Sequence, residues 1–138
     1  MTRPILRQFK VKKYVKRNDR RPGWVYLQQA ADGSVKVGLS RNLKIRERQL
    51  EAAYGRLNRL AAVWVPNMMQ LEDTIKERFK YANFHKAPGL TGRTEWHRVD
   101  DRQTLEMIAA LYAGAFWMNA TYLFYIVLAV ALLWAIFL

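Results

Sequence analysis

The sequence predicts an α+β domain, in which helices flank a small antiparallel three-stranded sheet, followed by one C-terminal transmembrane helix. Two runs of β-branched and aromatic residues, joined by an Asp-Gly pair, predict a hairpin. Two helical stripes on either side of a third β-rich run predict the rest of the domain. The chain after Glu106 carries no charge, and its apolar stretch is long enough to span a bilayer.

The hairpin begins with a strand over residues 23–29, turns at Asp32 and Gly33, and returns over residues 35–39. Side chains alternate along a strand, so Val35 and Val37 share one face and Lys36 takes the other. Tyr26, on the first strand, shares the face of Lys36 in some registers, and the sequence alone leaves the register open.

A helix over residues 42–54 follows, with Ser40 as its expected N-cap and Gly55 as its stop. Residues 59–65 alternate as a third strand, which ends at Pro66. Asn67 is then expected to cap a second helix that runs to about residue 84, with a buried stripe of Leu71, Ile75, Phe79 and Ala82. A short extended piece is expected over residues 93–99.

The tail is expected to enter a lipid membrane through residues 116–138, as the continuation of a helix that starts near residue 100. A buried core helix is the competing interpretation, but such a helix has a polar face, and residues 122–138 have none. Aromatic residues gather near both ends of the stretch, as they do at the two interfaces of a bilayer. They are Trp117, Tyr122, Tyr125 and Trp134.

Charge is strongly positive, with 23 Lys and Arg against 11 Asp and Glu, a net charge of +12. Every basic residue lies at or before Arg102, so the positive-inside rule predicts a single-pass protein whose N-terminal domain is cytoplasmic. The membrane is then a host inner membrane or, equivalently oriented, a virion membrane. The chain has no cysteine, which excludes disulfides and thiolate metal sites.

The excess of positive charge predicts a polyanionic partner, either nucleic acid or the anionic headgroups beneath the anchor. Residues 1–22 form a basic arm, and residues 23–100 and 101–138 are the expected domain and its membrane tail. Candidate nucleic-acid contacts are the cations of the arm and of the first helix. They are Lys10, Lys12, Lys13, Lys16, Arg17, Arg41 and Lys44.

Four motifs occur in a characteristic order. They read Gly23-Trp24-Val25-Tyr26, then Val35-Lys36-Val37-Gly38, then Asn42-Leu43-Lys44-Ile45-Arg46, then Leu71-Glu72 with a later Glu95-Trp96. This order resembles the GIY-YIG endonuclease superfamily, and in particular the branch of many phage proteins whose second motif carries lysine in place of tyrosine. The resemblance covers about residues 23–99 and implies a nuclease fold built on a hairpin.

The resemblance also implies four catalytic residues. Tyr26 would position or activate the attacking water, and Arg46 would stabilise charge on the scissile phosphate. Glu72 would hold one Mg²⁺ or a similar divalent cation. Lys36 would stand for the second tyrosine, as a hydrogen-bond donor or proton shuttle, provided that burial or nearby cations lowered its pKa. DNA is the implied substrate, with low sequence specificity because no second reading domain is visible.

Each residue also has a structural explanation. Tyr26 suits a core aromatic, Arg46 a solvated helix face, and Glu72 an i,i+4 pair with Lys76. His85 and His97, the only histidines, are expected in loops or on the surface.

Three functions therefore stay open. The first is a membrane-anchored, metal-dependent DNA endonuclease. The second is an inactive nucleic-acid-binding membrane protein, such as a structural component of a membrane-containing phage virion. The third is a scaffold whose basic patch meets anionic lipid. The oligomeric state is also left open.

Overall fold

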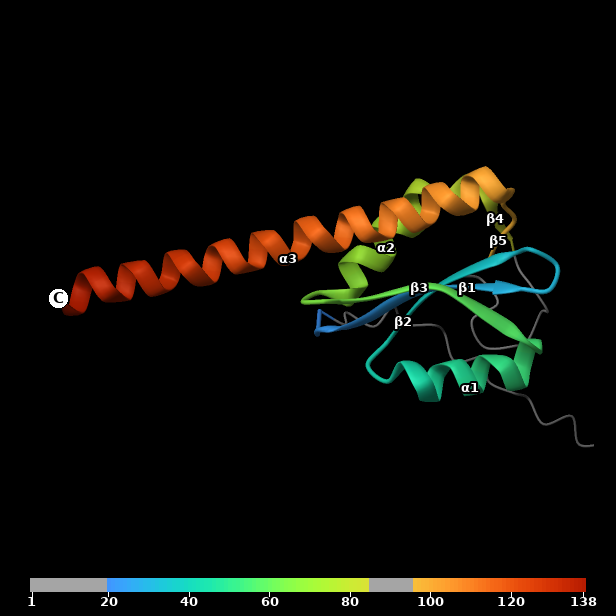
Figure 1. Ribbon diagram of the computed structural model, residues 1–138, viewed down its shortest axis with the longest axis horizontal. Coiled ribbons are helices and arrows are strands. Elements are labelled where there is room, and N and C mark those ends of the chain that lie inside the picture. Colours follow the sequence, from blue (N-terminus) through green and yellow to red (C-terminus); the bar gives the residue numbers. More distant parts are fainter. Residues whose placement is uncertain (1–19, 85–95) are drawn as a thin grey trace, which may run out of the picture.

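The computed structural model describes residues 20–84 and 96–138, which form one antiparallel sheet and three long helical elements (Figure 1). The strand order is β3-β1-β2-β5-β4. The strands are β1 (Gly23–Ala30), β2 (Val35–Ser40), β3 (Leu57–Val65), β4 (Asn83–Phe84) and β5 (Trp96–His97). The predicted α+β class and its three long strands are confirmed.

The predicted number of strands is wrong, because two short strands extend the sheet from three to five. β5 pairs with β2 at Val35 and Lys36, and β4 pairs with β5. A two-residue strand has no periodicity of its own. Such a pairing joins segments about 60 residues apart, which local sequence patterns do not report.

The hairpin turn has the predicted chemistry. Gly33 takes a positive φ of 86°, which glycine adopts without strain. The backbone N–H of Ser34 donates to the Asp32 carboxylate at 3.0 Å, so the aspartate closes the turn.

The helix α1 (Leu43–Tyr54) has Asn42 as its N-cap, so the prediction of Ser40 is wrong. The Asn42 side chain accepts the N–H of Ile45. The Ser40 hydroxyl instead accepts the N–H of Asn42 at 3.0 Å, which closes the turn just before the cap. Gly55 ends the helix as predicted, with a φ of 80°.

The helix α2 (Met68–Arg78) is capped by Asn67 as predicted, but it ends earlier than predicted. A short 3₁₀ turn, η1 (Lys80–Ala82), follows and leads directly into β4. The earlier end lets Asn83 pair with His97 on β5, which a continuing helix would prevent. The predicted stripe from Leu71 to Ala82 is buried.

The helix α3 (Asp101–Phe137) is one continuous element, as predicted. Asp100 and Gln103 form a capping box at its start. Its first half is part of the domain core, where Met107, Ala110, Leu111 and Ala115 are buried. Its second half extends beyond the sheet, and residues 121–138 are all exposed (Figure 1).

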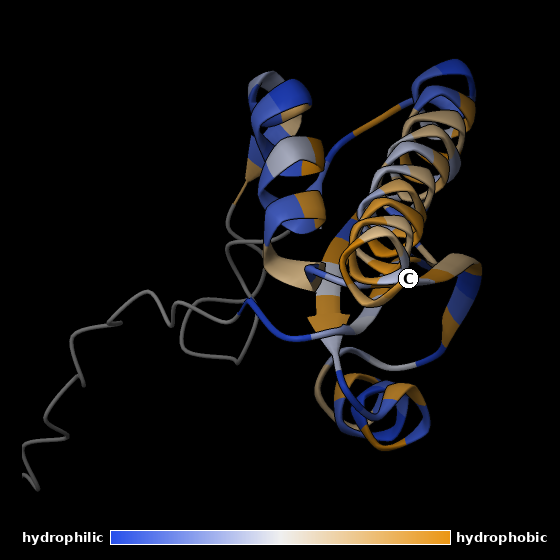
Figure 2. Ribbon diagram, turned by 90° about the vertical axis from the view of Figure 1, so that its left-hand side faces the viewer, coloured by the Kyte–Doolittle hydropathy of each residue, from blue (hydrophilic) through white to orange (hydrophobic). Residues whose placement is uncertain are grey.

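The far half of α3 is long and apolar enough to cross a membrane, and none of that window is buried. Seen along the axis of α3, this half is largely hydrophobic on all sides (Figure 2). A buried core helix is therefore the wrong interpretation for this stretch, since nothing in the described structure covers it.

Two apolar layers lie on opposite faces of the sheet (Figure 2). Helices α2 and α3 cover one face, which presents Val25, Leu27, Val35 and Val37. Helix α1 covers the other face through Leu43 and Leu50, which pack in one cluster with Tyr26 and Trp96. The two faces thus carry different side chains of the same hairpin. This division decides which of the predicted site residues lie on the same face.

Several predictions fall outside the described residues. They concern the loop at residues 88–92, the Glu95 of the fourth motif, His85, and the arm cations Lys10, Lys12, Lys13, Lys16 and Arg17. His97 is described, and its expected surface position is wrong. It is fully buried on β5, because strand pairing with β2 and β4 encloses it.

Candidate functional site

Tyr26 and Lys36 lie on the same face of the sheet, the face that α1 covers. In the β1–β2 register, Tyr26 is opposite Gly38 and Gln28 is opposite Lys36. Directly opposed residues point their side chains to the same side, so the register left open by the sequence unites these two residues. Both side chains are fully buried.

Gly38 holds the Tyr26 ring in place by lacking a side chain. A Cβ built on Gly38 would lie 2.4 Å from the Tyr26 hydroxyl oxygen and 2.5 Å from the ring carbon that carries it. The end of the phenol therefore rests on the backbone of β2. The second motif therefore needs glycine at this position, because an aromatic ring from the neighbouring strand lies against its backbone.

Lys36 is enclosed by polar and aromatic neighbours. Gln28 opposes it on β1 and is almost fully buried, and Trp96 opposes it on β5. Trp96 packs edge-on against Tyr54 of α1, with ring centroids 5.0 Å apart. A fully buried lysine is rare in folded proteins. The role that the resemblance implies for Lys36, as a hydrogen-bond donor or proton shuttle, requires either burial or nearby cations, and Lys36 is buried.

Arg46 lies one turn into α1 and is half-buried. Its Nη1 donates to Gln49 Oε1 at 3.4 Å, a long bond to an exposed partner. Arg41 and Lys44, at the start of the same helix, are exposed. The first turn of α1 therefore presents cations beside a helix N-terminus, where an anion is favoured.

Glu72 comes from α2, on the opposite face of the sheet from α1. Its side chain is almost fully buried, and Oε1 accepts from Lys76 Nζ at 2.6 Å. This is the i,i+4 pair that the sequence offered as the structural role of Glu72. This pair differs from an exposed surface ion pair, because the Glu72 carboxylate is buried.

The four predicted catalytic residues therefore lie on both faces of the sheet. Tyr26 and Lys36 come together, Arg46 is on the helix that covers their face, and Glu72 is on the helix across the sheet. The two faces meet at the outer edge of β2. β5 pairs only with Val35 and Lys36, so in the described structure no strand covers that edge from Val37 to Ser40. The Tyr26 phenol lies over Gly38 beside this unpaired stretch, and both residues are buried.

The metal implied by the resemblance needs only one protein carboxylate, since Mg²⁺ bound to substrate phosphate commonly keeps several waters. Within residues 20–84 and 96–138, no three His, Cys, Asp or Glu side chains gather as a metal cluster. Glu72 fits the one-carboxylate type of site. One of its oxygens is held by Lys76, so a cation would use the other oxygen or compete with the ammonium.

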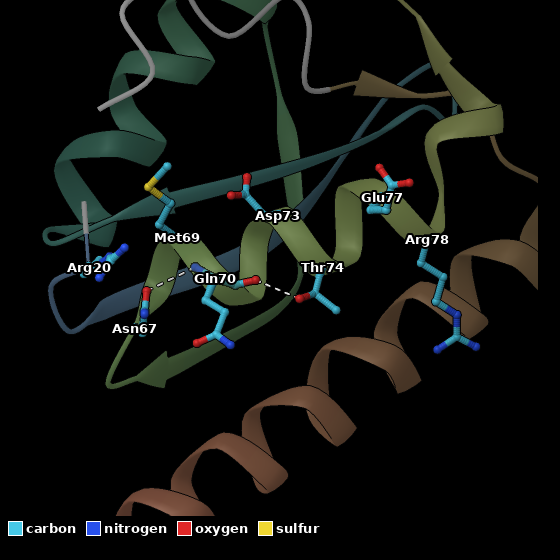
Figure 3. A pocket seen from close by; sticks show the side chains of 8 residues that line it. All are labelled: Arg20, Asn67, Met69, Gln70, Asp73, Thr74, Glu77 and Arg78. Carbon is cyan, nitrogen blue, oxygen red and sulfur yellow. Dashed lines mark hydrogen bonds between the residues drawn. The ribbon is translucent and has the colours of Figure 1, made fainter. Parts of the chain in front are cut away.

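Two grooves flank α2. One, of about 980 Å³, runs along the exposed side of α2 from Asn67 to Arg78 and includes Asp73 and Glu77 (Figure 3). The other, of about 660 Å³, lies between the start of α2 and the middle of α3. Neither is lined by Tyr26, Lys36, Arg46 or Glu72. Neither groove therefore adds support to the predicted catalytic set.

Sequence reasoning missed three buried polar residues, Gln28, Ser34 and His97. Alternation puts Gln28 on the same side of its strand as Tyr26, but only the strand register places it opposite Lys36. No local signal identifies His97, because its burial depends on pairing with β2 and β4.

Comparison with known proteins gives one family. A family model described as the T5orf172 domain matches residues 23–111, more than half of the chain. The match begins at β1 and ends inside the buried half of α3. No curated protein and no solved structure matches the chain.

Proposed function

Because the chain belongs to the T5orf172 domain family, a phage-associated and endonuclease-related family, we propose that it is a membrane-anchored, metal-dependent DNA endonuclease of the GIY-YIG type. The family suggests a nuclease-like function on DNA. The observation that carries the finer proposal is the seating of Tyr26 on Gly38, beside the buried Lys36. The motif order implies that this lysine stands for the second tyrosine.

In this proposal the scissile phosphate lies beside the stretch of β2 that carries Gly38. A water attacks phosphorus, a new P–O bond forms, and the bond to the leaving sugar oxygen breaks. Tyr26 and Lys36 orient the water from one side of the sheet, and the proton that the water loses passes through them to the leaving sugar oxygen, which departs as a hydroxyl. Arg46 neutralises charge on the non-bridging oxygens as it develops, which is usually the largest catalytic contribution.

Glu72 would hold the divalent cation, which when bound stabilises the leaving oxygen. The carboxylate reaches the same stretch only if its side chain extends past β2 from the α2 face. Its contact with Lys76 orients it before the cation binds. This is the step on which the enzyme hypothesis depends most.

The anchor in the proposal is the exposed half of α3, with residues 116–138 entering the bilayer as a single pass. The basic residues that precede it keep the domain on the cytoplasmic side, or on the equivalent side of a virion membrane. DNA would then be cut beside a membrane, with low sequence specificity and with cations of the arm and of α1 as its phosphate contacts.

A plasmid-nicking assay with Mg²⁺ tests the enzyme. Wild-type protein should convert supercoiled to nicked DNA, and EDTA should stop it. Glu72→Gln and Tyr26→Phe should each lower the rate by at least about 100-fold, as loss of a principal catalytic group does. Glu77→Gln is the matched control, because this exposed glutamate lies on the same helix. Equal rates for wild type and Glu72→Gln would refute the enzyme.

A second function is favoured by the Glu72–Lys76 pair itself, since a buried ion pair is a sufficient structural role for the glutamate. In that case the fold is retained without turnover, and the protein holds DNA at a membrane, for example as a structural component of a membrane-containing phage virion. Binding would then be independent of divalent metal, and no variant at Glu72 would change it beyond its effect on stability.

A further inference from the structure

The end of the domain nearest the apolar half of α3 has features of a membrane-contacting surface. β1 starts at this end, and β2 and β3 finish there, because the three strands are antiparallel. Trp24, Ser40 and Trp64 therefore form one row across the sheet. Helices α1 and α2 both begin at this end, just after Ser40 and Val65 respectively.

The position of this end along α3 is given by one contact. Asn119 Nδ2 donates to the backbone oxygen of Trp64 at 3.4 Å. The helix from Asn119 to Leu138 is about 30 Å long at 1.5 Å per residue, close to the thickness of the hydrocarbon core of a bilayer. An upright α3 therefore puts the row of Trp24, Ser40 and Trp64 at the headgroup layer. α3 is continuous through this level, so no flexible linker lifts the domain away.

Exposed apolar side chains are present at this end. Trp64 is 46 % exposed and packs edge-on against Trp24, with ring centroids 5.6 Å apart. Ile45, in the first turn of α1, is 52 % exposed. Tryptophan is enriched where a protein meets the headgroups, because it combines an apolar ring with an N–H donor.

Charge at this end is of one sign. The segments that build it, residues 20–24, 38–46 and 62–71, contain no Asp or Glu. They contain Arg20, Arg21, Arg41, Lys44 and Arg46. The nearest acidic residues follow in the next turn of each helix, Glu47 on α1 and Glu72 and Asp73 on α2, and Asp73 lines the same groove as Arg20. The N-termini of α1 and α2 point the same way and add to the positive potential.

We infer that this end, comprising Trp24, Arg41, Ile45, Trp64 and the neighbouring Arg20 and Arg21, docks on the anionic headgroup layer of the bilayer that α3 enters. The 660 Å³ groove beside it, between Pro66 and Gln70 on one side and Trp117 and Tyr122 on the other, opens at the same level. The inference rests on the membrane anchoring in the proposed function, but not on nuclease activity. It assigns Arg41 to lipid rather than to DNA.

Docking would also fix the orientation of the catalytic face. α1 and α3 run in roughly opposite directions in Figure 1, with the first turn of α1 toward the apolar half of α3. The far end of α1 and the hairpin tip then face the aqueous side. DNA would approach from the side of the domain and not through the membrane-facing end.

The test exploits the absence of cysteine from the chain, which allows single spin labels on the full-length protein. Ile45→Cys places a label at the docking end. Ala52→Cys is the matched control, since it is exposed, on the same side of α1, and two turns or about 10 Å farther away. Leu128→Cys reports on insertion of α3. The proteins are reconstituted in nanodiscs of phosphatidylcholine with or without phosphatidylglycerol, doped with a nickel-chelating lipid.

In nanodiscs with phosphatidylglycerol, relaxation by nickel at position 45 should exceed that at position 52 by at least about fivefold, given their separation along α1. Adding Arg41→Glu should reduce this enhancement at position 45. Arg56→Glu makes the same charge change at the opposite end of the domain and should leave it unaltered.

Equal relaxation at positions 45 and 52, with position 128 in lipid, would overturn the docking and leave the anchor intact. A label at 128 that stays accessible to water would overturn the anchor and the docking together. Protection of position 45 by duplex DNA, with no effect of phosphatidylglycerol, would assign the surface to DNA and also overturn the inference. None of these outcomes depends on whether the protein cuts DNA.

Discussion

Gly38 determines where the side chain of Tyr26, a candidate catalytic residue, can lie. The ring of Tyr26 lies where a side chain on the opposing strand would be, and only glycine leaves that space. The sequence identified both residues as parts of motifs. It could not show that Gly38 of the second motif leaves room for the Tyr26 ring of the first, because the contact depends on the register between the strands.

Substitution of Gly38 should therefore act through Tyr26. Gly38→Ala should destabilise the protein by about 1–3 kcal/mol, the usual cost of overpacking, and should displace the phenol. In a Tyr26→Leu background, which lacks the end of the ring, the same substitution should cost less. Chemical denaturation of the four proteins in detergent measures this coupling. Equal costs in both backgrounds would show that the ring is not the obstacle.

Lys76 has a similar residue-scale consequence for Glu72. If its ammonium and a divalent cation compete for the carboxylate, Lys76→Gln should lower the Mg²⁺ concentration needed for half-maximal nicking severalfold. Lys80→Gln is the control, because Lys80 pairs with the exposed Glu77 in the same way at 2.6 Å. An unchanged Mg²⁺ requirement in Lys76→Gln would mean that Glu72 is not the metal ligand.

At the scale of elements, the two halves of α3 differ in burial. Its first half packs in the core with α2 and β3, and its second half is covered by nothing in the described structure. The buried residues of α3 run to Ala115. The local sequence does not reveal this, because the apolar stretch begins within the first half, after Glu106, and only contacts with α2 and β3 separate the buried part from the exposed part.

The contact between α2 and α3 is close at Gly114. A Cβ there would lie 2.5 Å from Leu71 Cδ1. Gly114→Val should destabilise the domain by about 1–3 kcal/mol through overpacking. Ala113→Val, one position away and exposed, should cost only about 0.5 kcal/mol through helix propensity. Thermal or chemical unfolding of both variants checks this, and similar costs would argue against the packing.

At the scale of the whole molecule, the proposed function assigns the net charge of +12 to DNA and the apolar half of α3 to the bilayer. A chain that ends after Ala120 should remain folded and become soluble without detergent, because it keeps every buried residue of α3. Circular dichroism and gel filtration would check this. Aggregation of the shortened chain, with full-length protein folded in detergent, would mean that the exposed half supports the fold.

DNA binding by the same shortened chain should depend steeply on salt. If about six phosphates are contacted, affinity should fall roughly 10³-fold between 50 and 200 mM salt. Fluorescence anisotropy with a labelled duplex measures the slope. A chain lacking residues 1–22 is the comparison, and its slope should be shallower because the arm supplies many of the cations. Salt-independent affinity would contradict phosphate-based binding.

The sequence by itself determined the features set by neighbours along the chain. These are the hairpin and its Asp32-Gly33 turn, the Asn67 cap, the Glu72–Lys76 pair and the continuity of the apolar α3. Each depends on residues within a few positions of one another, so local propensity and spacing are sufficient to predict it.

Only the tertiary structure decided which residues share a face and which are enclosed. The register joined Tyr26 to Lys36, the pairing of β5 with β2 placed Trp96 against Lys36, and the packing of α2 put Glu72 across the sheet from α1. These outcomes depend on contacts between segments far apart in the chain. Their free energy comes from burying surfaces together, and no single segment carries that information.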